Sequence, residues 1–168
     1  MSGRVALIAG ASGLVGGFCL RFLLGDPGYR RVVSVGRRRV SIADPKLHQE
    51  TVDFYRLNEF AAALPADDVF CCLGTTIRKA GGKEAFRRID FDAVLYLARL
   101  SRQAGARRFF LVSSSGANSR SPVFYSRVKG EIEAAVAAAG FDAVAILRPS
   151  LLLGEREEFR LKERLGEA

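Results

Sequence analysis

Apolar runs of four or five residues alternate along the chain with longer segments in which apolar residues recur every three or four positions. The short runs predict strands, and the periodic segments predict amphipathic helices. Runs without polar alternation are typical of parallel strands covered by helices on both faces. We expect six strands, at residues 5–8, 31–35, 50–54, 69–73, 108–112 and 143–147.

The periodic segments predict helices at residues 14–23, stopped by residues 25–28, and at 84–104 and 124–139, with a short helical connection at 57–64 and a flexible basic loop at 78–82. The sheet-facing side of the first helix is expected to consist of Leu14, Val15, Phe18, Cys19, Phe22 and Leu23. That of the second is expected to consist of Phe86, Ile89, Ala93, Leu97, Leu100 and Ala104. This alternation predicts an α/β fold, a doubly wound parallel sheet in the order 3-2-1-4-5-6 with helices on both faces.

The composition fits one globular domain. The 168 residues are 49% hydrophobic, which suffices for one sizeable core. We assign the domain to residues 1–154 and treat residues 155–168 as a charged C-terminal segment. No apolar stretch is long enough to span a membrane or to serve as a secretory signal, so no membrane partner and a cytoplasmic location are expected.

The charge and the cysteines narrow the function classes. A net charge of +8 admits a polyanionic partner, but the basic residues are scattered in pairs without a nucleic-acid-binding motif, which favours solvated surface over nucleic acid. Cys19, Cys71 and Cys72 form neither a C-x-x-C motif nor a zinc pattern. We expect three reduced core cysteines and no metal site.

A glycine-rich turn separates the first strand from the first helix. Gly10, Gly13 and Gly16 follow the spacing G-x-x-G-x-x-G, which permits a tight turn, close approach of a pyrophosphate and close contact between helix and strand. The helix N-terminus would offer unpaired N–H groups to the phosphates. An ordinary strand-to-helix turn is the alternative, because the commoner dinucleotide spacing is G-x-G-x-x-G.

The ends of the second and third strands carry candidate nucleotide contacts. Arg37, Arg38 and Arg39 follow the second strand, where an acid would bind the 2′-hydroxyl of NAD and an arginine can pair with the 2′-phosphate of NADP. The sequence therefore predicts NADP (NADPH) in preference to NAD, with a solvated loop as the alternative. Asp53 is a candidate for the adenine amino group, although an exposed aspartate at a strand end explains it equally well.

Tyr125 and Lys129 are the candidate catalytic pair. Their i, i+4 spacing puts them on one helix face. A tyrosine hydroxyl carries protons poorly at neutral pH because its ordinary pKa is about 10, and a nearby positive charge favours the phenolate. A serine after the fifth strand, Ser114 or else Ser115, would hydrogen-bond the substrate oxygen. NADPH would deliver hydride to a carbonyl carbon while Tyr125 supplies the proton.

These features together resemble the short-chain dehydrogenase/reductase superfamily, in particular an atypical group that includes the human HIV Tat-interacting protein and its bacterial relatives. The glycine turn and Y-x-x-x-K are common to the whole superfamily. Residues 68–76, with their Cys-Cys-Leu-Gly-Thr-Thr stretch, are much more specific to the atypical group. Further marks are residues 79–81, Phe86 with residues 89–90, and residues 113–117, 125–131, 147–149 and 151–154.

The resemblance implies an NAD(P)-binding Rossmann fold and an oxidoreductase acting on a small-molecule carbonyl or alcohol. The cofactor residues would be Gly10, Ser12, Gly13, Leu14, Val15, Gly16, Arg37, Arg38, Asp53, Phe54, Leu73, Gly74, Thr75, Lys129 and Pro149. Within this set, Arg37 would hold the 2′-phosphate, Lys129 the nicotinamide ribose, and Pro149 would border the nicotinamide.

Two departures from the superfamily pattern leave a second function open. Asp90 lies near the position where many members carry a catalytic asparagine, and the chain stops soon after Gly154, where relatives continue into a region that covers the substrate. Truncation or a partner's contribution would each explain the short C-terminus, and the expected partners include a protein partner or a homo-oligomer. The alternative function is an NADP-binding regulatory or scaffold protein without turnover.

Overall fold

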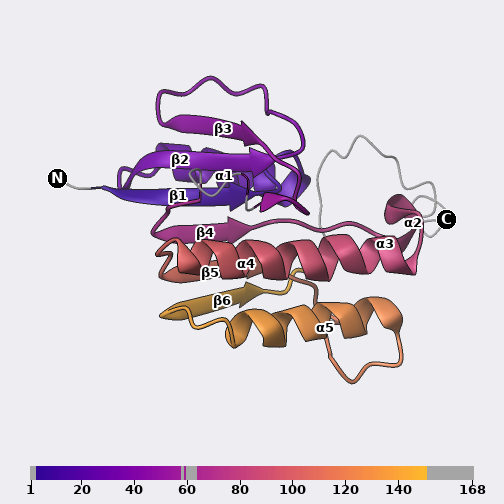
Figure 1. The fold of residues 1–168 in the computed structure, drawn as a ribbon. Helices are drawn as coiled ribbons and strands as arrows, with labels where there is room; N and C mark the ends of the chain where they lie inside the picture. Colours follow the sequence, from indigo (N-terminus) through magenta and orange to yellow (C-terminus); the bar gives the residue numbers. More distant parts are fainter. Residues whose placement is uncertain (1–2, 58, 60–63, 151–168) are drawn as a thin grey trace.

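The computed structural model describes residues 3–57, 59 and 64–150. Six parallel strands form one sheet in the order β3-β2-β1-β4-β5-β6, which confirms the predicted topology (Figure 1). The strands are β1 (Arg4–Ala9), β2 (Tyr29–Gly36), β3 (Leu47–Thr51), β4 (Asp68–Cys71), β5 (Arg108–Val112) and β6 (Ala143–Leu147). The expected domain boundary at residue 154 and the segment 155–168 lie outside the described residues.

Helices cover both faces of the sheet (Figure 1). α1 (Leu14–Gly25) packs on β1 and β2 from one side, and α4 (Val94–Gln103) and α5 (Phe124–Ala137) pack on the other. Successive strand residues point to opposite faces, so each face has its own core. Ile8 packs with the α1 side, whereas Leu7 packs with the α4 and α5 side. No helix in the described ranges is long and apolar enough to cross a membrane.

The rotation of α1 differs from the prediction. Phe18 and Phe22, expected to face the sheet, are 51% and 77% exposed, and the buried residues are Gly16, Leu20, Leu23 and Leu24. Gly16 sets this rotation, because a Cβ at that position would lie 2.1 Å from the carbonyl oxygen of Gly10. The helix approaches the sheet closely only with the glycine turned inward.

Two strands end earlier than predicted. β3 pairs Leu47 with Val32 and Thr51 with Gly36, so main-chain pairing with β2, rather than the apolar pattern, sets its limits. The expected strand at residues 50–54 is therefore wrong by three residues, and Asp53 lies beyond the strand. β4 ends at Cys71, so residue 73, expected within the strand, lies outside the sheet.

The connection from β4 to β5 also differs from the prediction. The expected flexible loop contains α2 (Ile77–Ala80), because the Thr76 side chain accepts a hydrogen bond from the Lys79 N–H and Gly81 ends the helix with φ of 90°. The single helix expected at 84–104 is divided into α3 (Lys83–Arg87), a π-helical turn (Arg88–Ala93) and α4. α5 ends at residue 137 instead of 139, and most of the connection at 57–64 lies outside the described residues.

A buried carboxylate joins four strands at the amino edge of the sheet. Asp68 is fully buried and accepts hydrogen bonds from Arg4, Tyr29 and Arg108, which belong to β1, β2 and β5. Burial and the Asp68 carboxylate raise the pKa of Tyr29, so its hydroxyl stays a donor. This cluster stabilises the edge opposite to the one at which ligands of open α/β sheets bind.

Candidate functional site

The glycine turn lies at the carboxyl edge of β1 and packs against the chain that follows β4. Gly10 has φ of 88°, and a Cβ there would lie 2.5 Å from the carbonyl oxygen of Cys72. Gly13 donates its N–H to the Gly10 carbonyl at 3.0 Å. A Cβ at Gly13 would meet only that carbonyl oxygen, at 3.4 Å, so the space beside it is open.

The start of α1 has the properties of an anion site. No side chain caps the helix, and its first turn holds no acidic residue. The first N–H groups of a helix lack partners within the helix and carry the positive end of its dipole. Ser12 is exposed, and Leu14 and Val15 are partly buried beside it. The open space at Gly13 and these uncapped N–H groups fit a pyrophosphate.

The predicted arginines follow β2, the neighbour of β1. Val35 of β2 pairs with Ala9 of β1, so the residues after the two strands lie side by side. Arg37 and Arg38 are exposed, and neither has an ion-pair partner among the residues that the structure describes. Arg39 instead donates a hydrogen bond to the carbonyl of Gln49 at 3.3 Å. Two guanidinium groups therefore remain available beside the glycine turn.

The residues after β3 are less favourable for the predicted adenine contact. The Asp53 carboxylate accepts a hydrogen bond from the Tyr55 N–H at 2.9 Å, so it stabilises its own turn. Phe54 is buried in the core on the α4 and α5 side. Its ring is therefore committed to packing, and only its main chain is free for a nucleotide.

Lys129 and Asp90 form a buried ion pair at the carboxyl edge of β4. Their side chains are 6% and 0% exposed, and the Lys129 Nζ lies 2.6 Å from the Asp90 Oδ1. The other carboxylate oxygen, Oδ2, accepts the Thr75 N–H at 2.9 Å. A Cβ on Gly74 would lie 3.6 Å from the Lys129 Nζ. The lysine ammonium is thus held against the glycine that follows β4.

The sequence marks Asp90 by its position and does not identify it as the partner of Lys129. It occupies the π-helical turn, and wide turns of this kind are frequent at functional sites. Burial raises the pKa of Asp90, opposed by the Lys129 ammonium and by the Thr75 N–H. One signal was available in the sequence: Asp90 interrupts the apolar stripe that joins Phe86 to Ala93.

Tyr125 lies in the first turn of α5, and its ring packs on Phe86 with the ring centroids 5.2 Å apart. The loop after β5 contacts the same turn, because the Asn118 N–H donates to the Ser126 carbonyl at 2.9 Å. The structure therefore brings the serine loop, residues 113–123 between β5 and α5, and Tyr125 to one region of the sheet's carboxyl edge, where Lys129 also lies.

The three serines after β5 differ in their surroundings. The hydroxyl oxygens of Ser113 and Ser114 are buried and have no hydrogen-bond partner among the described residues. Ser115 is exposed, and its N–H donates to the Pro149 carbonyl at 3.2 Å. Buried hydroxyls are normally paired, so an unpaired one is a candidate ligand contact. This favours Ser114 over Ser115 and adds Ser113, which the sequence did not select.

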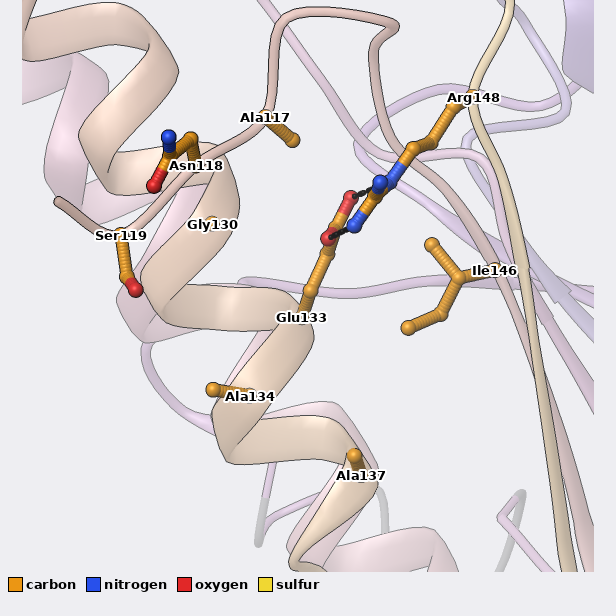
Figure 2. Close-up of a pocket in the computed structure, with 9 residues that line it drawn as sticks. All are labelled: Ala117, Asn118, Ser119, Gly130, Glu133, Ala134, Ala137, Ile146 and Arg148. Carbon is orange, nitrogen blue, oxygen red and sulfur yellow. Dashed lines mark hydrogen bonds and ion pairs between the residues drawn. The ribbon is translucent and has the colours of Figure 1, made fainter. Parts of the chain in front are cut away.

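A separate shallow pocket of about 460 Å³ lies between α5, the loop after β5 and the end of β6 (Figure 2). The Arg148 guanidinium donates two hydrogen bonds to the Glu133 carboxylate across it. Gly130 forms part of the wall and lets the loop pass close to α5, because a Cβ there would lie 2.1 Å from the Ser119 nitrogen. No predicted catalytic or cofactor residue lines this pocket.

Comparison with known proteins places the chain among nucleotide-dependent enzymes and their relatives. The profile of the NAD dependent epimerase/dehydratase family matches residues 6–165. Protein HTATIP2 of Rattus norvegicus is 42% identical over 170 residues, covering 99% of this chain and 70% of that protein. The mitochondrial protein fmp52 of Emericella nidulans is 39% identical over 167 residues, covering 95% of this chain and 71% of that protein.

Solved structures share the fold. The Bordetella bronchiseptica enzyme WbmH in complex with NAD+ matches with a TM-score of 0.77 at 18% identity, covering 99% of this chain and 64% of that one. MoeE5 in complex with UDP-glucose and NAD matches with a TM-score of 0.70 at 24% identity, covering 85% and 53%. The chain therefore spans between half and two thirds of the length of these two proteins.

The expected cytoplasmic location is contradicted by the relatives. The fmp52 proteins of Emericella nidulans, Aspergillus niger and Aspergillus fumigatus, which are 37–39% identical to the chain, are named as mitochondrial. The expectation rested on the lack of a recognisable signal in the sequence, and such a lack carries little information about location.

Proposed function

From the premise that the chain belongs to the NAD dependent epimerase/dehydratase family, within the short-chain dehydrogenase/reductase group of HTATIP2, we propose that it is an NADP-dependent oxidoreductase. The reaction is hydride transfer to or from a small carbonyl or alcohol substrate, with Tyr125 as proton donor. One observation carries the proposal: the Lys129 ammonium is buried at the carboxyl edge of the sheet, between Asp90 and Gly74.

The chain offers a binding group for each part of the nucleotide. The open space at Gly13 and the uncapped start of α1 receive the pyrophosphate. Arg37, with Arg38 beside it, pairs with a 2′-phosphate, which distinguishes NADP from NAD. Leu73, Gly74 and Thr75 follow β4 and border the adenosine side of the site, and Pro149 borders the nicotinamide. The solved structures that share the fold are described with NAD, so the proposed preference for NADP rests only on the arginines of this chain.

We assign the catalytic roles to three side chains, Tyr125, Lys129 and Ser114. When bound, NADPH supplies the hydride. The Tyr125 hydroxyl gives its proton to the substrate oxygen, and the Lys129 charge, four residues further along α5, stabilises the phenolate that remains. The unpaired Ser114 hydroxyl donates a hydrogen bond to the same substrate oxygen. Asp90 holds the Lys129 ammonium, so the lysine is positioned before ligands arrive.

Tyr125→Phe tests the enzymatic role. The purified protein is screened against aldehydes and ketones by the loss of NADPH absorbance, and turnover in the variant should fall by about a hundredfold or more. Nucleotide affinity should be unchanged, since the ring is retained. Tyr55→Phe is the matched control, because Tyr55 is an exposed tyrosine whose ring contacts Arg88. Equal turnover in Tyr125→Phe and wild type would reject the proposed proton donor.

A second function is favoured by the same ion pair. The Asp90 carboxylate neutralises the Lys129 ammonium at 2.6 Å, which weakens the field that Lys129 exerts on Tyr125. In that case the chain binds NADP as a regulatory or scaffold protein and does not turn over. NADPH binding without turnover on the whole carbonyl panel in the wild type would select this function, and turnover that appears in Asp90→Asn would identify the Asp90 carboxylate as its cause.

A further inference from the structure

The outer edge of β6 carries main-chain hydrogen-bonding groups that face no other strand. β6 is the last strand of the sheet, and among the described residues only β5 pairs with it (Figure 1). The Leu147 carbonyl accepts the N–H of Ser113, which follows β5, at 2.7 Å. Because the main-chain groups of successive residues point to opposite sides of a strand, Ala145 also turns toward β5, whereas Val144 and Ile146 turn outward.

The two edge strands of the sheet differ in how they discourage pairing with another chain. Edge strands are usually blocked by charged side chains, proline or a bulge. β3, at the opposite edge, carries the exposed side chains of His48 and Glu50, which contact each other at 2.7 Å. β6 consists of Ala-Val-Ala-Ile-Leu, pairs with β5 in an unbroken register, and exposes 52% of Leu147. It is therefore an apolar edge that another strand can join.

The sequence of β6 is complementary to itself when two copies pair antiparallel around Ala145. In this register Val144 of each copy lies opposite Ile146 of the other, and each such pair exchanges both of its N–H···O bonds through the outward groups. A shift by one residue places outward groups opposite inward ones. A shift by two residues leaves only one bonded pair within the strand. The pairing centred on Ala145 is thus the best one for the main chain.

The charged residues at the two ends of β6 match in the same register. Asp142 precedes the strand and Arg148 follows it, so pairing around Ala145 puts Asp142 of each copy opposite Arg148 of the other. The two side chains are 44% and 52% exposed, so both can reach a second copy. Opposite charges across an antiparallel pair are stabilising, whereas like charges are destabilising. A shift by two residues loses this match.

The flank of β6 has room for the second copy. Ile146 forms one wall of the shallow pocket beside β6, and the small side chains of Ala134 and Ala137 on α5 form another (Figure 2). The side chains of Val144 and Ile146 lie on this side of the sheet, where both are only partly buried. In the antiparallel pair, Val144 of the other copy packs beside Ile146 at the edge of this open space.

We propose that the outer edge of β6 is a homodimer interface, at which two copies of the chain pair β6 antiparallel around a two-fold axis beside Ala145 and join their sheets. The occupant is a second copy because the same strand, running in the opposite direction, matches both the outward main-chain groups and the end charges. A two-fold interface of this kind closes on itself and adds no further chains. The interface uses none of the residues assigned to the nucleotide or to catalysis, so it is independent of the proposed function.

Sedimentation velocity over a range of concentrations tests the dimer. Wild type should sediment as a dimer, and Ala145→Lys should weaken dimerisation by about tenfold or more, because two ammonium groups then meet at the two-fold axis. Ala43→Lys is the matched control, since Ala43 is an exposed alanine outside β6. Circular dichroism checks that both variants are folded. A wild type that stays monomeric at every concentration, or an Ala145→Lys variant that dimerises as wild type does, would overturn the proposal.

Cross-linking tests the register. In Ala145→Cys the two new thiols occupy a non-hydrogen-bonded pair with Cα atoms about 4.5 Å apart, within range of a disulfide. Mild oxidation should give a covalent dimer on non-reducing electrophoresis, and dithiothreitol should reverse it. Ala143→Cys is the matched control, because its thiol lies opposite Leu147 of the other copy, and wild type controls for the three native cysteines. Equal or greater cross-linking in Ala143→Cys would overturn the proposed pairing.

Discussion

Glycines that look alike in the sequence have different structural roles at the turn between β1 and α1. Gly10 is needed for the fold, since it combines φ of 88° with a contact that leaves no room for a Cβ. Gly13 has an extended backbone, with φ of −87° and ψ of 168°, and faces open space. The spacing predicted the turn from the sequence, but only the contacts separate a folding glycine from a candidate ligand-binding one.

Alanine substitutions at these two glycines should therefore have different effects. Gly10→Ala should lower the free energy of unfolding by about 1–3 kcal/mol, because a non-glycine residue is strained in that conformation. Gly13→Ala should leave stability within about 0.5 kcal/mol but weaken NADPH binding, since its methyl group enters the phosphate space. Urea unfolding and calorimetric titration measure the two quantities. Loss of stability in Gly13→Ala with normal nucleotide binding would contradict the assigned roles.

The ionisation of Asp90 makes a pH-dependent contribution to stability. Burial raises its folded-state pKa above the value of about 3.9 typical of an unfolded chain, so the folded state binds the proton more tightly. Its stabilising contribution is therefore fully present below the unfolded pKa and is lost as the pH rises through the folded pKa.

Asp90→Asn removes this titration and keeps an acceptor for the Thr75 N–H. The difference in unfolding free energy, wild type minus variant, should fall as the pH rises from about 4 and then become constant. Urea unfolding at a series of pH values measures it. A difference that grows with pH would show that pairing with Lys129, and not burial, dominates the pKa of Asp90.

Element limits were predictable where apolar patterning decides them and were not where main-chain contacts do. The predicted limits of β5 and β6 are confirmed, because both strands are bounded by turns and their apolar runs pair along their whole length. β3 was misplaced because it is a half-exposed edge strand whose limits depend on pairing with β2. The rotation of α1 depends on Gly16, whose contribution is a missing side chain, and apolar periodicity does not detect that.

The close approach of α5 to the loop after β5 makes Gly130 a sensitive position. Gly130→Ala should destabilise the protein by about 1–3 kcal/mol, because the added carbon would overlap the main chain at residues 118 and 119. Gly17→Ala is the matched control in another helix. Its nearest contact would be an ordinary 3.6 Å, so helix propensity should stabilise it by about 0.5–1 kcal/mol. Thermal unfolding compares them, and equal effects would contradict the packing described for α5.

At the scale of the whole molecule, the two edges of the sheet have different roles. The amino edge carries the buried Asp68 cluster, and the carboxyl edge carries the glycine turn, the arginines, Lys129 and the serine loop. The topology predicted from the sequence already brings the carboxyl-edge residues together. It did not reveal the Asp68 cluster or the Asp90–Lys129 pair, because buried ion pairs join residues whose charges look like surface charges in the sequence.

Asp68→Ala should separate stability from ligand binding. It should lower the unfolding free energy by about 1–3 kcal/mol, since the buried Tyr29 hydroxyl loses its acceptor while the partly exposed arginines become hydrated. NADPH affinity of the folded variant should be unchanged. Asp142→Ala, which removes an exposed pair with Arg107, is the control and should barely move the urea midpoint. A large loss of NADPH affinity in folded Asp68→Ala would show that the edges are not independent.

Calorimetric titration with NADPH and, separately, NADH tests the central claim most directly, in wild type, Arg37→Ala and Arg31→Ala. Arg31 is an exposed arginine at the other end of β2, so its variant makes the same charge change away from the site. Wild type should bind NADPH more tightly than NADH. Arg37→Ala should weaken NADPH binding by about tenfold or more and so reduce the difference in affinity between NADPH and NADH. Arg31→Ala should bind both nucleotides as wild type does. Equal binding of both nucleotides by wild type, or an unchanged Arg37→Ala, would contradict the account.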